Sequence, residues 1–266
     1  MAIPKKIHYI WLGGGEMSST IQNCMATWQK VCPDYEIVEW NEHNYDMTQS
    51  QLIKNAVRAK NWALAADMMR AEILLKHGGI YLDTDVELIK PFDDLLEYSF
   101  FIGYEAKLWC NNAVIGSEAG HDVLKKVVDI YNVDSTVDKH SNLLCVHTYS
   151  AVFKYYYDHN PDGKNVVLDG GIALLSPEYF YSQHWLTRKT KHSDLSYCIH
   201  RCSNTWLDQA QRIKFKALRI TRMICRRHIT EFCEGIYTKG LYRKCRNKIL
   251  KIENGKVSDG DGRVRV

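Results

Sequence analysis

The feature that most constrains the fold is a helix-forming run that leads through two glycines directly into a strand. The run NWALAADMMRAEILLKHGG, Asn61 to Gly79, is rich in Ala, Leu and Met, and its terminal glycines are typical of a helix end. Ile80-Tyr81-Leu82 then begins a β-branched and apolar strand. A helix that gives way at once to a strand is typical of a layered α/β protein.

The same alternation occurs nearer the amino terminus. A short apolar strand is expected over Ile7 to Leu12, a helix around Ile21 to Val31, and a second strand over Glu36 to Trp40. The first strand ends in the glycines 13–15, and ligands gather at the carboxyl ends of strands in α/β sheets. This triplet lacks the spacing of a dinucleotide or P-loop motif, so neither kind of phosphate site is supported.

Composition limits the class of protein. With 266 residues and 45% hydrophobic content, the chain can form one large domain or a domain with an appendage. No run approaches about 20 apolar residues, and the start MAIPKKIHYIW has too short an apolar part for a secretory signal, so we expect a soluble, unexported protein. Nine cysteines without CxxC pairs favour buried thiols in a reducing compartment over disulfides or a zinc site.

Basic residues are concentrated near the carboxyl end. From Arg212 to Lys251, Lys and Arg recur among apolar residues, and acidic residues are rare. Amphipathic helices on an anionic membrane and a solvated basic face over a small helical core are both compatible with this pattern. Nucleic-acid binding is not favoured because no recognition motif accompanies the charge. We expect a catalytic domain over 1–208, a basic helical extension over 209–252 and a flexible tail over 253–266.

Two carboxylates, Asp83 and Asp85, follow the strand that begins at Ile80. If the strand continues, both project from one face, where they repel each other unless a cation or a proton intervenes. Oxygen ligands select Mg²⁺ or Mn²⁺, often together with substrate phosphates. An EF-hand is not supported because apolar residues follow the two carboxylates. A phosphatase of the haloacid dehalogenase type would have Thr or Val where Glu87 stands.

Asp67 and Arg70 are three residues apart and share one face of the expected helix. They form either a local ion pair on a solvated face or a semi-buried pair beside the carboxylates.

Four blocks of the sequence resemble the DXD glycosyltransferases of family 32 and the large clostridial glucosylating toxins. In chain order they are IPKKIHYIWLGG, ADMMRAEILLKHGGIYLDTDVELIKPFDDLL, CNNAVIGSEAGH and, more weakly, CIHRCSNTW. Together they span roughly residues 3 to 206. The last block departs from the family by carrying Arg201, Cys202 and Asn204, and Thr205 replaces Ser.

The resemblance implies a GT-A fold, which is a Rossmann-like mixed sheet flanked by helices, and transfer from a nucleotide-sugar with retention. It places Asp83, Asp85 and His200 at a divalent metal, with Asp85 the more direct ligand. It gives Asp67, Arg70, Asp83, Asp85 and Asn112 catalytic roles. The implied donor-binding residues are Ile10, Trp11, Asp67, Arg70, Asp83, Thr84, Asn111, His200, Thr205 and Trp206.

Individual roles also follow from the resemblance. Trp11 would stack on the nucleotide base, Asn111 or Asn112 would bond the sugar, and Trp206 would bind the leaving phosphate through its indole N–H. Structural alternatives remain open: Trp11 as core packing, the asparagines as turn caps, and His200 as an ordinary structural histidine.

We therefore expect a retaining hexosyltransferase that uses Mn²⁺ or Mg²⁺ and a UDP-sugar, such as UDP-Gal, UDP-Glc or an N-acetylhexosamine analogue. The expected acceptor is a saccharide or lipid-linked saccharide in bacterial capsule or O-antigen synthesis. The expected location is the cytoplasm, peripherally at the inner face of the membrane through the basic tail. Without a carboxylate nucleophile that can be named, front-face attack is favoured. The alternatives are a toxin-like protein glycosyltransferase and a non-catalytic nucleotide-sugar-binding or polyanion-binding module.

Overall fold

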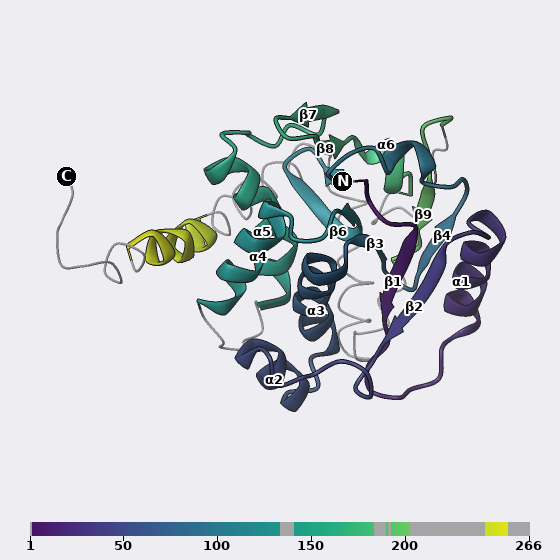
Figure 1. The fold of residues 1–266 in the computed structure, drawn as a ribbon, viewed down its shortest axis with the longest axis horizontal. Helices are drawn as coiled ribbons and strands as arrows, with labels where there is room; N and C mark the ends of the chain where they lie inside the picture. The colour runs from purple at the N-terminus through teal and green to yellow at the C-terminus, as the bar shows by residue number, and fades with distance from the viewer. Residues whose placement is uncertain (1, 134–140, 184–189, 191–192, 203–242, 255–266) are drawn as a thin grey trace, which may run out of the picture.

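The structure, a computed structural model, describes residues 2–133, 141–183, 190, 193–202 and 243–254, with the side chains of 141–146 left out. Within these residues the chain forms a seven-stranded mixed sheet and a separate two-stranded sheet (Figure 1). The larger sheet has the order β2 (Glu36–Trp40), β1 (Lys6–Ile10), β3 (Gly79–Leu82), β6 (Trp109–Ser117), β5 (Phe100–Ala106), β8 (Ile172–Leu175) and β7 (Val166–Leu168).

Strand directions decide which side chains meet at each edge of this sheet. β1 is parallel to both β2 and β3, so the carboxyl ends of these three strands lie at one edge. β6 is antiparallel to β3 and to β5, which brings the beginning of β6 to that same edge. β8 is parallel to β5, and β7 is antiparallel to β8 at the far end of the sheet. The edge formed by β1, β3 and β6 therefore receives the predicted site residues.

Helices cover one face of the sheet, and mixed elements cover the other. On the first face lie α2 (Gln51–Arg58), α3 (Trp62–His77), α4 (Asp122–Asn132) and α5 (Ser141–Tyr156). On the second lie α1 (Ser19–Val31), the short helix η1 (Asp93–Leu95), α6 (Pro177–Phe180), and the two-stranded sheet of β4 (Val86–Leu88) and β9 (Cys198–His200). Side chains of β3 alternate between the two cores, with Tyr81 in the first and Ile80 and Leu82 in the second. The predicted fold class, a mixed α/β sheet flanked by helices, is confirmed.

The junction between α3 and β3 is fixed by capping and by a buried histidine. The Asn61 side chain accepts a hydrogen bond from Leu64 N at 3.2 Å and begins α3. Gly78 ends the helix with φ +62°, and a Cβ there would lie 2.8 Å from Ala119 N. His8 Nε2 donates to Gly78 O at 2.9 Å, while its Nδ1 accepts from Trp40 Nε1 at 3.1 Å. The helix and strand predicted on either side of Gly78-Gly79 are both present.

The strand does not continue through Asp83 and Asp85, so the condition under which both would project from one strand face is not met. β3 ends at Leu82, and a turn closed by Val86 N and Asp83 O, 3.0 Å apart, follows it. The physical reason is that Val86 leaves the main sheet to pack against α1, where its carbonyl accepts a hydrogen bond from Trp28 Nε1 at 2.7 Å. Similarly, the first strand ends at Ile10 rather than at Leu12.

Part of the basic extension is described. A helix over 243–254 buries Cys245 and Ile249 against the domain, with Cys245 beside Ala151 and Tyr155 of α5. The rest of the extension, 209–242, and the tail from 255 lie outside the described residues. In the described parts of the chain, no helix combines the length and apolarity needed to cross a membrane. The described cysteines with placed side chains are free, and all except Cys202 are buried.

We predict that His8 makes the folded protein sensitive to acid. Burial lowers the pKa of His8 from 6.5 to about 4. The unfolded chain thus takes up a proton that the folded protein refuses, so the free energy of unfolding falls as the pH drops from 6.5 to about 4. The loss from this residue is on the order of 3 kcal/mol.

Urea unfolding of the wild type and of His8→Gln at about pH 7 and about pH 4.5 measures this loss. We expect the free energy of unfolding to fall less in the variant than in the wild type between the two pH values. The variant should nevertheless be less stable than the wild type at about pH 7. Equal losses in the two proteins would contradict the assignment. The buried His147, whose pKa is also lowered to about 4 by burial, contributes to both proteins alike.

Candidate metal and donor site

Three side chains with metal-binding atoms converge past the end of β3. One ligand atom from each of Asp83, Asp85 and His200 lies within 4.8 Å of the others. The carboxylates come from the turn after β3, and the histidine ends β9. The two carboxylates supply the oxygen ligands that Mg²⁺ and Mn²⁺ prefer, so they fit the cation that the sequence predicted.

Pairing between β4 and β9 brings His200 to the carboxylates. Val86 is the register partner of His200, and Arg201 N donates to Asp85 O at 2.9 Å. His200 Nε2 consequently lies 3.3 Å from Asp85 Oδ1. Burial alone would lower the pKa of His200, but the nearby Cys202 sulfur and Asp85 carboxylate raise it well above its ordinary value. His200 therefore faces the negative charge of the Asp85 carboxylate, and it would have to release its proton to bind a cation.

A buried guanidinium lies directly behind the carboxylates. Arg70 Nη2 is 3.1 Å from Asp67 Oδ1 and 3.1 Å from Asp83 Oδ1. Its Nη1 donates to Asn112 O at 2.7 Å, and its central carbon lies 4.4 Å from the centroid of the Tyr81 ring. The Tyr81 hydroxyl also donates to Asp83 Oδ1, at 2.9 Å. One charged group of α3 thus holds the first carboxylate of the DxD motif in place.

The structure decides between the two interpretations of Asp67 and Arg70. They are 7% and 5% exposed, so they form a buried pair beside the carboxylates and not a pair on a solvated face. Burial alone would lower the pKa of Arg70, but its attraction to Asp83 and Asp67 raises that pKa well above the ordinary value. Arg70 remains a cation at every pH at which the protein is folded.

The two asparagines lie inside β6 and cap no turn. Asn112 Nδ2 donates to Asp67 Oδ1 at 2.9 Å, which joins it to the Arg70 cluster. Asn111 Oδ1 accepts from Ala113 N at 2.8 Å, and its Nδ2 donates to Glu105 Oε2 at 3.0 Å. Asn112 thus contacts a predicted catalytic residue through a side-chain hydrogen bond, while Asn111 holds the local strand.

Trp11 follows β1 at the same edge as Asp83. Its indole Nε1 donates to Gly15 O at 2.8 Å, and its backbone N donates to Trp40 O at 2.9 Å. The ring is half-buried and packs against the core on the α1 face, so core packing describes part of its surface. Ile10 is buried in the other core, with the α2 and α3 side chains.

The remaining predicted residues fall into two groups. Thr84 is half-buried in the turn between Asp83 and Asp85. Thr205 and Trp206 lie outside the described residues. Sequence reasoning missed the role of Tyr81, and it missed an ion pair between Glu87 and Arg201. The opposite charges of that pair were the only available signal, because the two residues are 114 positions apart.

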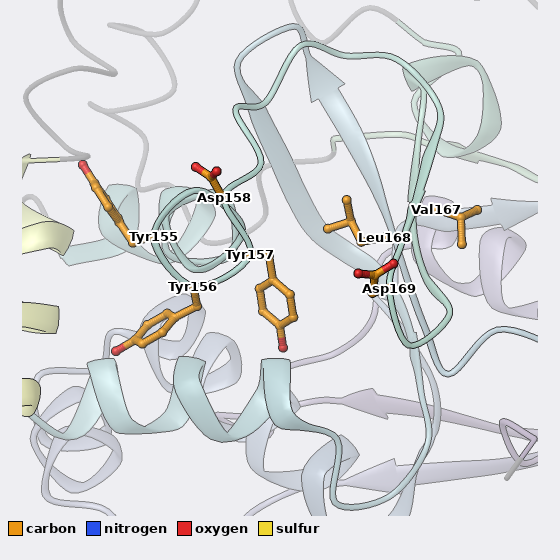
Figure 2. Close-up of a pocket in the computed structure, with 7 residues that line it drawn as sticks. All are labelled: Tyr155, Tyr156, Tyr157, Asp158, Val167, Leu168 and Asp169. Carbon is orange, nitrogen blue, oxygen red and sulfur yellow. The ribbon is translucent and has the colours of Figure 1, made fainter.

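A hollow elsewhere on the surface does not belong to this site. Figure 2 shows it between the end of α5 and the edge strand β7, where the labelled tyrosines point in different directions. The Tyr157 hydroxyl donates to Asp122 Oδ2 at 3.1 Å, and Lys126 Nζ lies 4.6 Å from the ring centroid of Tyr156. β6, β5 and β8 lie between β7 and β3 in the sheet, so this hollow is remote from Asp83. Its lining residues are Tyr155, Tyr156, Tyr157, Asp158, Val167, Leu168 and Asp169.

A family model of known proteins matches the part of the chain that carries the DxD motif. Residues 18–101 match the family model described as "Glycosyltransferase sugar-binding region containing DXD motif". That region includes Asp67, Arg70, Asp83 and Asp85, and it ends before β6 and β9. The resemblance to DXD glycosyltransferases that the sequence suggested is therefore confirmed.

Individual relatives cover part of the chain. Inositol phosphoceramide mannosyltransferase 3 of Schizosaccharomyces pombe is 32% identical over 139 residues, which are 48% of this chain and 36% of that protein. Subversion of eukaryotic traffic protein A of Legionella pneumophila is 25% identical over 162 residues, 48% of this chain and 24% of that protein. The solved structure of "PaToxG Glycosyltransferase" aligns with a TM-score of 0.49 and 16% identity, over 59% of this chain and 70% of that chain. The chain thus matches about a third or less of the length of the two curated relatives.

We predict that Arg70 is required for stability as well as for the site. In Arg70→Met, Asp67 and Asp83 lose their shared cation while they stay close together, so the free energy of unfolding should fall by about 3 to 5 kcal/mol. Urea unfolding measures this fall. Arg58→Met is the matched control, an exposed arginine of α2 whose loss should change stability by about 0.5 kcal/mol or less. If the two substitutions lowered the free energy of unfolding equally, the buried ion pairs of Arg70 would not contribute more to stability than an exposed arginine does.

Proposed function

We propose that this chain is a GT-A glycosyltransferase that moves a hexose from a nucleotide-sugar with the help of a divalent cation. The observation that carries the proposal is the convergence of Asp83, Asp85 and His200 beside the buried Arg70–Asp67 pair. The match of residues 18–101 to the DXD sugar-binding region supports it. Mn²⁺ or Mg²⁺ would be held by the two carboxylates and the imidazole.

Breaking a glycosyl phosphate bond builds negative charge on the departing diphosphate. A bound divalent cation supplies the positive charge that stabilises this group. The chain's own part is to fix the ligands in advance. Arg70 and Tyr81 both contact Asp83 Oδ1, and His200 lies against Asp85. Because these contacts exist before the donor arrives, little reorganisation is needed when charge develops.

Positions around the metal ligands suit the donor. The Trp11 ring stands at the same sheet edge as Asp83, where an aromatic face can stack on uracil, and we therefore propose a UDP-sugar. Asp67 is held by Arg70 and Asn112, so its carboxylate is a fixed acceptor for sugar hydroxyls and not a free nucleophile. We accordingly propose retention through front-face attack, in which the leaving phosphate oxygen takes the proton of the acceptor.

For the acceptor we propose a saccharide or a lipid-linked saccharide in bacterial capsule or O-antigen assembly, with the enzyme in the cytoplasm at the inner face of the membrane. The helix over 243–254 supports the membrane part of this proposal. Its Cys245 and Ile249 side chains face the domain, while Arg243, Lys244 and Arg246 are exposed and can attract anionic lipid. Free, buried thiols suit the reducing compartment.

A second acceptor class is a host protein. The Legionella relative, whose name describes subversion of eukaryotic traffic, favours this class. The two are separated by incubating the protein with a donor and either a eukaryotic lysate or a bacterial lipid extract, followed by intact-mass measurement. A protein that gains the mass of one hexose or one N-acetylhexosamine supports a protein acceptor, whereas glycosylated lipid supports the first.

The proposed activity is tested by a donor screen. Purified protein is incubated with a panel of UDP- and GDP-sugars, with Mn²⁺, with Mg²⁺ or with EDTA, and the released nucleoside diphosphate is measured. We expect release from one donor only when a divalent cation is present. Asp85→Asn should lower the rate by at least about a hundredfold, because it removes a charged metal ligand.

Asp34→Asn is the control for the donor screen. Asp34 is an exposed carboxylate that pairs with Lys5 on the surface, so the rate should stay unchanged. Release of diphosphate that persists in EDTA would overturn the metal dependence. No release from any donor would favour a non-catalytic binding module.

A further inference from the structure

We infer that Glu87 and Arg201 are positioning residues that set the register of β9 on β4 and thereby place His200 in the metal site. This inference rests on the proposed function, because it gives His200 a cation to bind. Neither residue belongs to the proposed ligand set of Asp83, Asp85 and His200. Arg201 is one of the positions at which this chain departs from the family pattern, so the family resemblance assigns it no role.

The two-stranded sheet is too small to hold His200 by backbone bonds alone. β4 and β9 contain three residues each, and their register pairs Val86 with His200 and Leu88 with Cys198. Two strands of this length are marginally stable at best. Side chains must therefore supply the rest of the pairing free energy.

The Glu87–Arg201 pair has the geometry to supply it. Arg201 Nε donates to Glu87 Oε2 at 2.8 Å, and Arg201 Nη2 contacts the same oxygen. The two side chains are about one-third exposed, so the pair is partly shielded from water. A fork of two N–H groups on one carboxylate is directional as well as attractive. Arg201 also donates its backbone N–H to Asp85 O at 2.9 Å, which joins the pair to the second carboxylate of the motif.

Alternation along the strands keeps these charges out of the metal site. Val86 and Leu88 are buried, and Glu87 between them points the other way. Arg201 follows His200, so the two side chains likewise diverge. The positive charge of Arg201 is thus held by Glu87 instead of competing with a cation at Asp85.

Register is the property that the ion pair controls. If β9 slipped by one residue on β4, every side chain of β9 would move to the opposite face, and His200 would leave Asp85. In the observed register His200 Nε2 is 3.3 Å from Asp85 Oδ1. A slipped register would also separate Glu87 from Arg201. The ion pair consequently favours the one register in which the third metal ligand is in place.

The test measures Mn²⁺ binding without any donor, by electron paramagnetic resonance of free Mn²⁺. We expect Glu87→Gln and Arg201→Gln to weaken Mn²⁺ binding about tenfold or more, as is common when groups that orient metal ligands are removed. The double charge exchange, Glu87→Arg with Arg201→Glu, should recover most of the affinity. Wild-type affinity in both single variants would overturn the inference, and so would failure of the wild type to bind Mn²⁺.

A matched control is available in the main sheet. Lys6 and Glu36 are cross-strand partners on β1 and β2, with Lys6 Nζ and Glu36 Oε2 2.7 Å apart, and they lie away from the site. Glu36→Gln removes an ion pair of the same kind and should leave Mn²⁺ affinity unchanged. A loss of affinity equal to that of Glu87→Gln would overturn the specific role of the Glu87–Arg201 pair.

Two further measurements keep the result interpretable. Arg201→Lys retains the charge but loses the fork, so it should bind Mn²⁺ with intermediate affinity even if Arg201→Gln does not fold. Wild-type affinity in Arg201→Lys would overturn the directional role. In donor turnover, the Mn²⁺ concentration needed for half-maximal rate should rise in the single variants, while the rate at saturating Mn²⁺ changes little. If the wild type binds Mn²⁺ and releases no diphosphate, the proposed function fails while Mn²⁺ affinity still tests the pair.

Discussion

The arrangement of the site depends on the buried charge of Arg70. A guanidinium removed from water costs several kcal/mol unless its charge and its N–H groups are matched by partners. Here the partners come from three elements: Asp67 from α3 itself, Asp83 from the end of β3, and the Asn112 carbonyl from β6. The ring of Tyr81 covers the guanidinium. Satisfying one cation therefore fixes a helix and two strands relative to one another.

This requirement divides the work between the two carboxylates. Arg70 Nη2 and the Tyr81 hydroxyl both contact Asp83 Oδ1, so much of the negative charge of Asp83 is already compensated within the protein. Asp85 lies in a turn and faces His200, whose Nε2 is 3.3 Å from Asp85 Oδ1. A metal ion would consequently meet one carboxylate oriented by the buried guanidinium and one that the β4–β9 pairing brings against an imidazole. The expectation that Asp85 is the more direct ligand stays a prediction.

Local signals in the sequence predicted the parts of the site that local chemistry builds. The helix from Asn61, its glycine end and the apolar strand after it follow from propensity and capping, and the three-residue spacing correctly placed Asp67 and Arg70 on one face. Sequence periodicity could not show that β3 stops at Leu82. The strand ends there because Val86 contacts α1 and pairs with β9, and neither contact is visible in the local sequence.

Contacts between segments that are far apart in the chain could not be predicted from the sequence. The stacking of Arg70 on Tyr81 depends on how α3 folds back over β3, and the Glu87–Arg201 pair depends on a strand pairing that bridges 114 positions. The charges of Glu87 and Arg201 do not indicate that these two residues pair with each other, because 25% of the chain is charged and many other pairings are possible. The sequence also could not show whether Asp67 is buried. Its burial in the structure is what decides between a buried pair beside the carboxylates and an ion pair on a solvated face.

The separation between β4 and β9 also orders the events of folding. The seven-stranded sheet is complete once β8 has formed at Leu175, whereas His200, the proposed third metal ligand, enters only with β9, which begins at Cys198. Closing so long a loop costs entropy before any contact offsets it, so pairings of high sequence separation form late. A chain emerging from the ribosome therefore presents its whole main sheet before it brings together the three residues of the proposed metal site. Under the proposed function, cation binding depends on a strand pairing that forms after the scaffold that supports it.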